Sequence, residues 1–180
     1  MRSELVLIGG RSGAGKTTAA IALHELLVAH TVEHAVIEGD YLDLAYPVPH
    51  LVHAEADLAE RNLAAIWANY RALGYRRLIF TNTVSVLSAT SLARALGDDP
   101  VVRTVLLRAT DHAVRIRLGR RAHGSSVDDQ LDHSARTSVM LDTASPDGTH
   151  RIDTDDLTPH EVAARIAELT GWLSAPSGRA

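Results

Sequence analysis

The stretch that most constrains the fold of this chain is residues 10–17, which read Gly-Arg-Ser-Gly-Ala-Gly-Lys-Thr. They fit the pattern G-x-x-x-x-G-K-[ST], a glycine-rich loop that joins a strand to a helix and surrounds a phosphate chain. The flanking sequence agrees, because residues 5–8 form an apolar block of strand length just before the loop. Apolar residues at helical spacing follow through 18–27. The order of strand, loop and helix is therefore the one that the motif requires.

The residue types in this loop are those that triphosphate binding needs. Gly10, Gly13 and Gly15 keep side chains away and permit positive φ, so that backbone N–H groups can point at phosphate oxygens. The start of the following helix adds the positive end of its dipole. We expect Lys16 to reach the β- and γ-phosphates of ATP and the Thr17 hydroxyl to coordinate Mg²⁺. The predicted nucleotide-binding residues of the loop are Gly10, Arg11, Ser12, Gly13, Ala14, Gly15, Lys16, Thr17 and Thr18.

Lysine occurs once in the chain, at this loop. Lys16 is the only lysine among 18 basic residues, and all the others are arginine. A compact ammonium is wanted between phosphates. The placement therefore favours phosphate binding over the alternative, a glycine-rich turn between strand and helix that binds nothing.

Length and composition indicate one ordinary globular domain. At 180 residues the chain can form a single core, and its 46% apolar and 22% charged residues are typical values. The net charge of −4 argues against a nucleic-acid partner, and the absence of cysteine excludes disulfides and thiolate metal sites. No signal peptide or membrane-spanning apolar run is evident. We expect a cytoplasmic protein without membrane partners, with one domain at 1–173 and a disordered tail at 174–180.

Strand-like and helix-like patterns alternate along the chain. The alternation implies right-handed crossovers and a three-layer α/β fold, in which helices cover both faces of a five-stranded, mostly parallel sheet. The last helix has the clearest start, with Thr158 as N-cap, Pro159 in the first turn and Glu161 completing a capping box. The expected strands are 5–8, 35–37, 77–81, 101–107 and 150–152, and the expected helices include 57–73, 89–96, 128–141 and 159–170.

Ligands of such sheets bind at the carboxyl ends of the strands, so the residues that follow each strand are candidates for a site. Asp40 follows the second strand, which we expect beside the strand of the phosphate loop. Its carboxylate could hold Mg²⁺ and take a proton from an attacking hydroxyl, or it is a solvated turn residue. Asp43 is a candidate for binding the acceptor, although aspartate is also common in turns. His50 and His53 flank the presumed acceptor site, or are simply exposed.

An arginine cluster lies in the helix predicted to begin near residue 111. Arg115, Arg117, Arg120 and Arg121 fall within seven residues, and spacings of three and four put several of them on neighbouring faces. Such a cluster can neutralise charge on a phosphoryl group during transfer. The alternative is a solvated basic face of the helix.

Taken together, these motifs resemble the small P-loop kinases, a group that contains gluconate kinase, shikimate kinase, adenylylsulfate kinase and chloramphenicol phosphotransferase. The resemblance rests on the phosphate loop, on residues 38–42, on the lid pattern R-x-x-R-x-x-H at 117–123 and on residues 154–156. It implies a P-loop NTPase fold with an Arg-rich lid at about 117–130. It also implies that Arg117 stacks on adenine, that Arg120 touches the phosphates, and that Asp155 lines the adenine.

Two segments depart from that family pattern. The third predicted strand ends at residues 80–83 without the aspartate that some relatives carry there. Asp40 would then be the main protein carboxylate near the metal. Residues 41–56 match no acceptor site that we can identify, so the phosphoryl acceptor stays open.

The expected function is an ATP- and Mg²⁺-dependent kinase, a monomer or homodimer, that transfers the γ-phosphate to a hydroxyl of a small molecule. Lys16, Asp40 and Arg120 are the predicted catalytic residues. The alternatives are a nucleoside monophosphate kinase, an NTPase whose hydrolysis drives another process, and a nucleotide-binding regulatory protein. A monophosphate acceptor needs arginines, and only Arg61 and Arg71 occur between residues 40 and 74. This scarcity favours an acceptor with a free hydroxyl.

Overall fold

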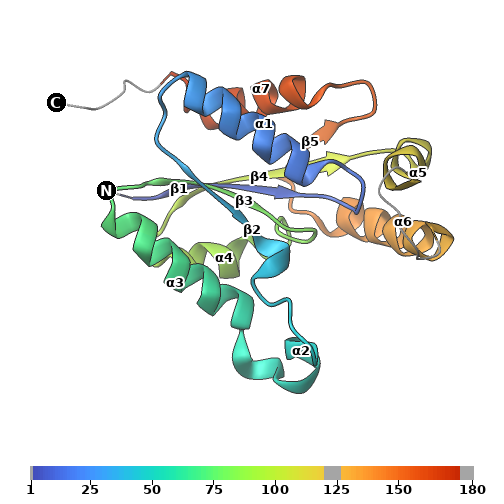
Figure 1. Cartoon of the computed structure of the whole chain (residues 1–180), viewed down its shortest axis with the longest axis horizontal. Coiled ribbons are helices and arrows are strands. Elements are labelled where there is room, and N and C mark those ends of the chain that lie inside the picture. Colours follow the sequence, from blue (N-terminus) through green and yellow to red (C-terminus); the bar gives the residue numbers. More distant parts are fainter. Residues whose placement is uncertain (1, 120–126, 175–180) are drawn as a thin grey trace.

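The fold is built on a five-stranded sheet in which every strand pair is parallel. The structure is a computed structural model, and it describes residues 2–119 and 127–174. The strands lie in the order β2-β3-β1-β4-β5, with helices on both faces (Figure 1). The strands are β1 (Glu4–Gly9), β2 (Ala35–Glu38), β3 (Arg77–Thr81), β4 (Val101–Arg108) and β5 (His150–Asp153).

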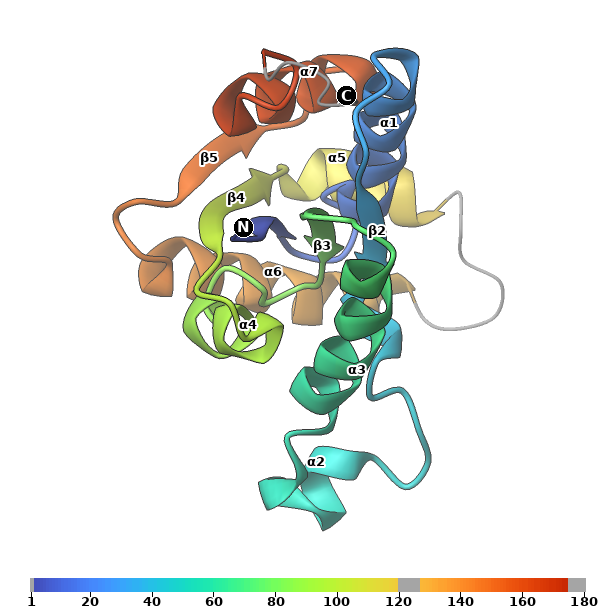
Figure 2. The same cartoon turned by 90° about the vertical axis from the view of Figure 1, so that its left-hand side faces the viewer.

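The helices form the two outer layers. α1 and α7 pack on one face of the sheet and α3 and α4 on the other, while α5 lies beyond the carboxyl end of β4 (Figures 1 and 2). The helices are α1 (Lys16–Ala29), α2 (Pro49–Val52), α3 (Leu58–Ala72), α4 (Ala89–Leu96), α5 (Asp111–Gly119), α6 (Val127–Ala144) and α7 (Pro159–Thr170). Two short 3₁₀ turns, η1 (Gly39–Tyr41) and η2 (Ala54–Ala56), lie between β2 and α3.

The side chains of β1 build both halves of the core. Val6 and Ile8 pack in the cluster shared with α1 and α7, whereas Leu5 and Leu7 pack with Trp67 of α3 on the opposite face. All four β1 side chains are buried, because successive residues of a strand point to opposite faces and both faces are covered. The continuous apolar run of residues 5–8 is thus explained by a central strand that has no solvent-facing side.

The expected α/β architecture is confirmed, with five parallel strands and helices on both faces. β3 and α4 have the bounds expected from the sequence. Residues 41–56, which match no acceptor site in the sequence, contain the short α2 and η2. The Arg-rich lid is only partly within the described residues, since 120–126 lie outside them, and so do the tail residues 175–180.

One expectation about the sheet is wrong. β2 does not lie beside β1, because β3 pairs with β1 on one side and with β2 on the other. Asp40, which follows β2, is therefore separated from the strand of the phosphate loop by a whole strand. The end of β3 lies between Asp40 and the phosphate loop.

Within residues 2–119 and 127–174, no helix is both long and apolar enough to cross a membrane.

The start of α7 has the capping box expected from the sequence. The Glu161 backbone N–H donates to Thr158 Oγ1 at 3.3 Å, and the Thr158 N–H donates to Glu161 Oε2 at 2.7 Å. Pro159 occupies the first turn, where its missing N–H costs nothing. The hydrogen bond from the Thr158 backbone holds the pKa of Glu161 below its usual value.

We predict that Thr158→Ala lowers the free energy of unfolding by about 1 kcal/mol at neutral pH, because it removes one side of this box. Urea unfolding followed by circular dichroism measures the difference, with His160→Ala in the same turn as control. A carboxylate with a lowered pKa stabilises the fold above its unfolded pKa and loses that contribution as pH falls through the folded value. The difference between wild type and variant should therefore shrink in acid; an unchanged difference would contradict a role for ionised Glu161.

Candidate functional site

The phosphate loop follows β1 and turns directly into α1. Gly10, Gly13 and Gly15 have φ values of 147°, 83° and 99°, a backbone region that side chains rarely adopt. A Cβ at Gly10 would lie 2.6 Å from the Leu107 carbonyl oxygen, so a side chain cannot be accommodated there. Among the described residues, no side chain caps the N-terminus of α1. The loop therefore offers backbone donors and the positive end of a helix to an anion.

Lys16 lies within this loop and is largely buried, with 8% of its surface exposed. Its Nζ donates a hydrogen bond to the Gly10 carbonyl oxygen at 3.0 Å, across the width of the loop. The ammonium is thus held over the turn formed by the glycines. The Lys16 ammonium and the backbone N–H groups of the glycine loop together are suited to binding a triphosphate.

Thr17, the expected magnesium ligand, is hydrogen-bonded to a carboxylate that the sequence analysis did not single out. Its Oγ1 donates to Glu38 Oε2 at 2.8 Å, and the other oxygen of Glu38 accepts a hydrogen bond from the Thr81 hydroxyl. Glu38 is the last residue of β2, two positions before Asp40, so a second carboxylate lies beside the expected metal site. The sequence signal for Glu38 is Glu-Gly-Asp directly after an apolar strand, a pattern in which the sequence-based expectation gives a role to Asp40 alone.

Asp40 lies at the same end of the sheet and is held by the residues after β3. Its Oδ1 accepts hydrogen bonds from the Asn82 side chain at 2.8 Å and from the Thr83 backbone N–H at 3.3 Å. Gly39 lets the chain pass this close, since a Cβ there would lie 2.3 Å from Phe80 Cζ. β3 thus ends without an acid, but Thr81 and the residues that follow it donate hydrogen bonds to Glu38 and Asp40.

The acids at this edge of the sheet suit a magnesium ion bound together with phosphates. Within the described ranges, no three His, Asp or Glu side chains gather as a preformed metal cage. Mg²⁺ commonly uses one or two protein oxygens and takes its other ligands from phosphates and water. Thr17 and Glu38 provide such a partial set beside the phosphate loop. The residues present therefore fit ATP with Mg²⁺.

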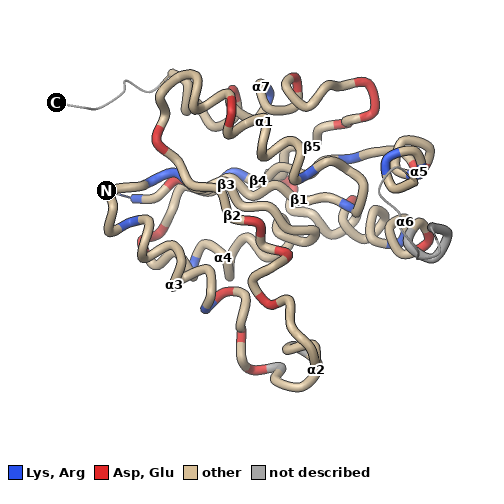
Figure 3. The backbone as a smooth tube through the Cα atoms, viewed as in Figure 1, with Lys and Arg blue, Asp and Glu red and all other residues tan. Residues whose placement is uncertain are grey.

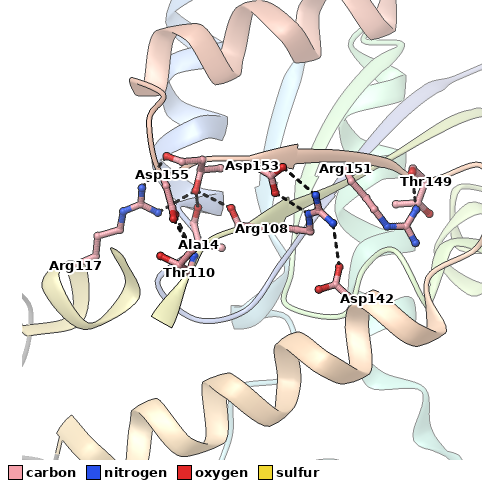
Figure 4. Close-up of polar contacts among 10 residues, drawn as sticks. Ala14, Arg108, Thr110, Arg117, Asp142, Thr149, Arg151, Asp153 and Asp155 are labelled. Atoms are coloured by element: carbon pink, nitrogen blue, oxygen red, sulfur yellow. Dashed lines mark hydrogen bonds and ion pairs between the residues drawn. The ribbon is translucent and has the colours of Figure 1, made fainter. Parts of the chain in front are cut away.

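Arg117 contacts both the phosphate loop and the loop after β5, while its stacking on adenine stays a prediction. Arg117 Nη2 donates to the Thr154 carbonyl oxygen at 2.9 Å, and its Nη1 donates to Thr154 Oγ1 at 3.0 Å and to the Gly13 carbonyl oxygen at 3.3 Å. Asp155 accepts a hydrogen bond from the Thr110 backbone N–H at 3.1 Å (Figure 4). Arg117 therefore joins the phosphate loop to residues 154–156. Arg120, the other predicted lid arginine, lies outside the described residues.

A cavity of about 510 Å³ opens beside residues 153–157. None of the loop residues 10–17 lines it, so it is not the triphosphate site. Arg108 projects into this region, where Asp153 accepts hydrogen bonds from its Nε at 2.8 Å and its Nη2 at 2.9 Å (Figure 4). These hydrogen bonds raise the pKa of Arg108 above its usual value. The arginine charge is thus matched within the protein.

The side chain of Arg11 takes part in buried polar contacts with residues outside the phosphate loop. Its side chain is 3% exposed and faces α6, where its Nε donates to Ser134 Oγ at 2.7 Å and its guanidinium pairs with Asp111. Ser134 Oγ in turn donates to the Ser12 carbonyl oxygen at 2.9 Å. Arg11 can therefore contact a nucleotide only through its backbone. No local sequence pattern marks Ser134 or Asp111 as its partners.

The predicted acceptor residues lie in the segment between β2 and α3. This segment extends away from the sheet (Figure 1). Asp43 is half-buried after η1, and His53 is exposed at the end of α2. The backbone of His50 lies in α2, but its side chain is outside the described part of the chain. Among the described side chains, the structure records no hydrogen bond from Asp43 or His53 to Asp40, so their role in acceptor binding stays a prediction.

No protein-family model matches the chain. Over 171 residues it is 27% identical to a nucleotide-binding protein of Thermobifida fusca, which covers 93% of this chain and 52% of that protein. A nucleotide-binding protein of Histophilus somni is 29% identical over 171 residues, with 92% and 52% coverage. The chain therefore spans about half the length of these curated relatives.

Solved structures, two of them small-molecule kinases, have the same fold. A gluconokinase from Sinorhizobium meliloti gives a TM-score of 0.60 at 20% identity and covers 99% of this chain and 100% of its own. The adenylylsulfate kinase of Mycobacterium tuberculosis gives 0.58 at 18% identity, with 97% and 99% coverage. The tunicamycin resistance protein of Deinococcus radiodurans gives 0.60 at 25% identity, with 94% and 96% coverage. The chain is thus a P-loop protein with the kinase-type fold.

We predict that Ser134→Ala destabilises the protein by about 1–3 kcal/mol, because it leaves a buried guanidinium N–H of Arg11 without its acceptor. Chemical unfolding measures this loss. Ser138→Ala, one turn further along α6, is the matched control and should cost less. Equal losses for the two variants would show that the Arg11 contact contributes nothing specific.

Proposed function

We propose that this protein is an ATP- and Mg²⁺-dependent phosphotransferase that transfers the γ-phosphate to a hydroxyl of a small molecule. The observation that carries the proposal is the convergence of Lys16, the Thr17–Glu38 pair and Asp40 at one end of the sheet. The kinase-type fold of the solved neighbours supports it. So does the name of the curated relatives, which states nucleotide binding.

The phosphate loop would bind the triphosphate and neutralise its developing charge. Backbone N–H groups of residues 13–17 would contact the phosphate oxygens, and Lys16 Nζ would exchange the Gly10 carbonyl for the β- and γ-phosphates. Bound Mg²⁺ would supply charge neutralisation on the β- and γ-oxygens. Glu38 would orient the Thr17 hydroxyl toward this position, since it already accepts a hydrogen bond from that hydroxyl.

Asp40 would act on the acceptor rather than on the nucleotide. Both of its described hydrogen bonds go to Oδ1, which fixes the carboxylate and leaves Oδ2 outside these two bonds. An acceptor hydroxyl that donates to Oδ2 would be oriented for in-line attack and could transfer its proton there. Glu38 and Asp40 would then divide the two tasks that the sequence analysis gave to Asp40 alone.

A nucleotide-binding regulatory protein is the second candidate. It is favoured by the curated relatives, whose name states nucleotide binding only and which are about twice as long as the matched region. Coupled release of ADP separates the two candidates. A kinase releases ADP faster when its acceptor is present, whereas a regulatory protein or a simple NTPase gives the same rate without any acceptor.

The direct test is a screen of hydroxyl compounds with ATP and Mg²⁺, in which ADP release and the phosphorylated product are both measured. Lys16→Ala is the control, and it should abolish transfer while circular dichroism shows an intact fold, because it removes charge stabilisation worth several kcal/mol in the transition state. Near-normal turnover of folded Lys16→Ala would contradict the assignment of the phosphate loop. Acceptor-independent hydrolysis as the sole activity would contradict phosphotransfer.

Glu38→Gln and Asp40→Asn should have different kinetic effects. We expect Glu38→Gln to raise the Mg²⁺ concentration needed for half-maximal turnover, because the partner of Thr17 loses its charge. Asp40→Asn should lower kcat by about a hundredfold with little change in ATP binding, because a general base is removed. Steady-state kinetics against Mg²⁺, ATP and acceptor measure both effects. Identical profiles for the two variants would refute the division of tasks.

A further inference from the structure

The segment between β2 and α3, residues 41–57, exposes an unusual number of apolar side chains. Tyr46 is 97% exposed and Leu51 is 75% exposed, and apolar side chains that gather on one exposed segment often mark a binding site. The segment begins directly after Asp40 and extends away from the sheet, past the N-terminal end of α3 (Figure 1). Its exposed large apolar residues are Tyr41, Leu44, Tyr46, Val48, Leu51 and Val52.

The charge on this part of the chain has one sign. Residues 39–60 include five acidic residues and no lysine or arginine. Acidic positions follow one another along the tube from the end of β2 to the start of α3 (Figure 3). A carboxylate or phosphate on a ligand would therefore meet repulsion here, because no lysine or arginine of residues 39–60 offsets the five carboxylates.

The two arginines of α3 do not neutralise the acidic charge of residues 39–60. Arg71 lies in the last turn of α3, where its Nη1 is 3.6 Å from Asp98. Asp98 also accepts hydrogen bonds from Ser3, just before β1, so this ion pair lies at the amino end of the sheet, opposite the phosphate loop. Arg61 is exposed in the first turn of α3, next to Glu60 and one turn from Asp57.

We propose that residues 41–57 bind the phosphoryl acceptor, and that this acceptor is an alcohol with an apolar portion and no anionic group. The proposal rests on the phosphotransferase function proposed above, and it narrows the class of substrate. The apolar portion would pack on Tyr46 and Leu51, while a hydroxyl reaches Asp40 at the start of the segment. The acidic surroundings would exclude alcohols that carry a carboxylate or a phosphate.

Four ligands that differ in two properties test the proposal. The ligands differ in whether they carry a phenyl group and whether they carry a carboxylate. They are phenyl β-D-glucoside, methyl β-D-glucoside, phenyl β-D-glucuronide and methyl β-D-glucuronide. Calorimetry measures the binding of each to the whole protein in the presence of Mg²⁺ and a non-hydrolysable ATP analogue. We expect phenyl glucoside to bind tightest, with the loss of the aryl group and the gain of the carboxylate each weakening binding by about tenfold.

Surface variants locate the site. Tyr46→Ser with Leu51→Ser should remove most of the advantage of the phenyl over the methyl compound. Leu73→Ser, at the far end of α3 and 78% exposed, is the matched control and should leave the ratio unchanged. Arg61→Gln should not weaken the glucuronides relative to the glucosides, which it would do if Arg61 held an anionic acceptor.

The outcomes separate this inference from the proposed function. Glucuronides that bind as tightly as the glucosides overturn it, and so does the absence of binding by phenyl glucoside. A double serine variant that changes only the oligomeric state in sedimentation, with unchanged ligand ratios, would show that the surface contacts another copy of the chain and would also overturn it. Failure of transfer from ATP, with the binding ratios as expected, would instead contradict the phosphotransferase function.

Discussion

The burial of β1 on both faces is the constraint on which the rest of the structure depends. β1 pairs with β3 and β4, and its four apolar side chains reach both halves of the core. Because β1 has a paired strand on each edge and packed helices on each face, the position of its carboxyl end is fixed. The phosphate loop starts at that end. The positions of Lys16 and Thr17 relative to Glu38 and Asp40 therefore follow from hydrophobic packing that lies away from the site. The side chains of the candidate site are therefore positioned by a strand whose own side chains do not belong to the site.

The local features of this structure could be predicted from the sequence, and the non-local ones could not. The strand and helix bounds, the glycine conformations and the α7 capping box depend on residues within a few positions of one another. The order of β1, β2 and β3 depends on pairing between distant segments, so the position of Asp40 was wrong by one strand. The bond between Arg11 and Ser134 joins residues 123 positions apart, and neither residue has a local signal for it.

β3 ends in neutral residues instead of the acid that some relatives carry there. These neutral residues donate hydrogen bonds to the acids Glu38 and Asp40. Thr81 and Asn82 are neutral donors: Thr81 holds Glu38 at the end of β2, and Asn82 holds Asp40 in η1. Gly39 between those acids allows the chain to pass against Phe80. Two carboxylates fixed by different donors have different environments, which is the condition under which two chemically similar groups can serve different roles.

The anchoring of α5 and α6 to the phosphate loop has a mechanical consequence. Arg117 of α5 is bonded to the carbonyl oxygen of Gly13, and Ser134 of α6 to that of Ser12, so two adjacent peptide units hold the helices on either side of residues 120–126. A rotation of either peptide plane would change the anchor of one helix, and a shift of the loop as a whole would displace both. The phosphate loop therefore anchors both α5 and α6, in addition to offering its backbone N–H groups to an anion.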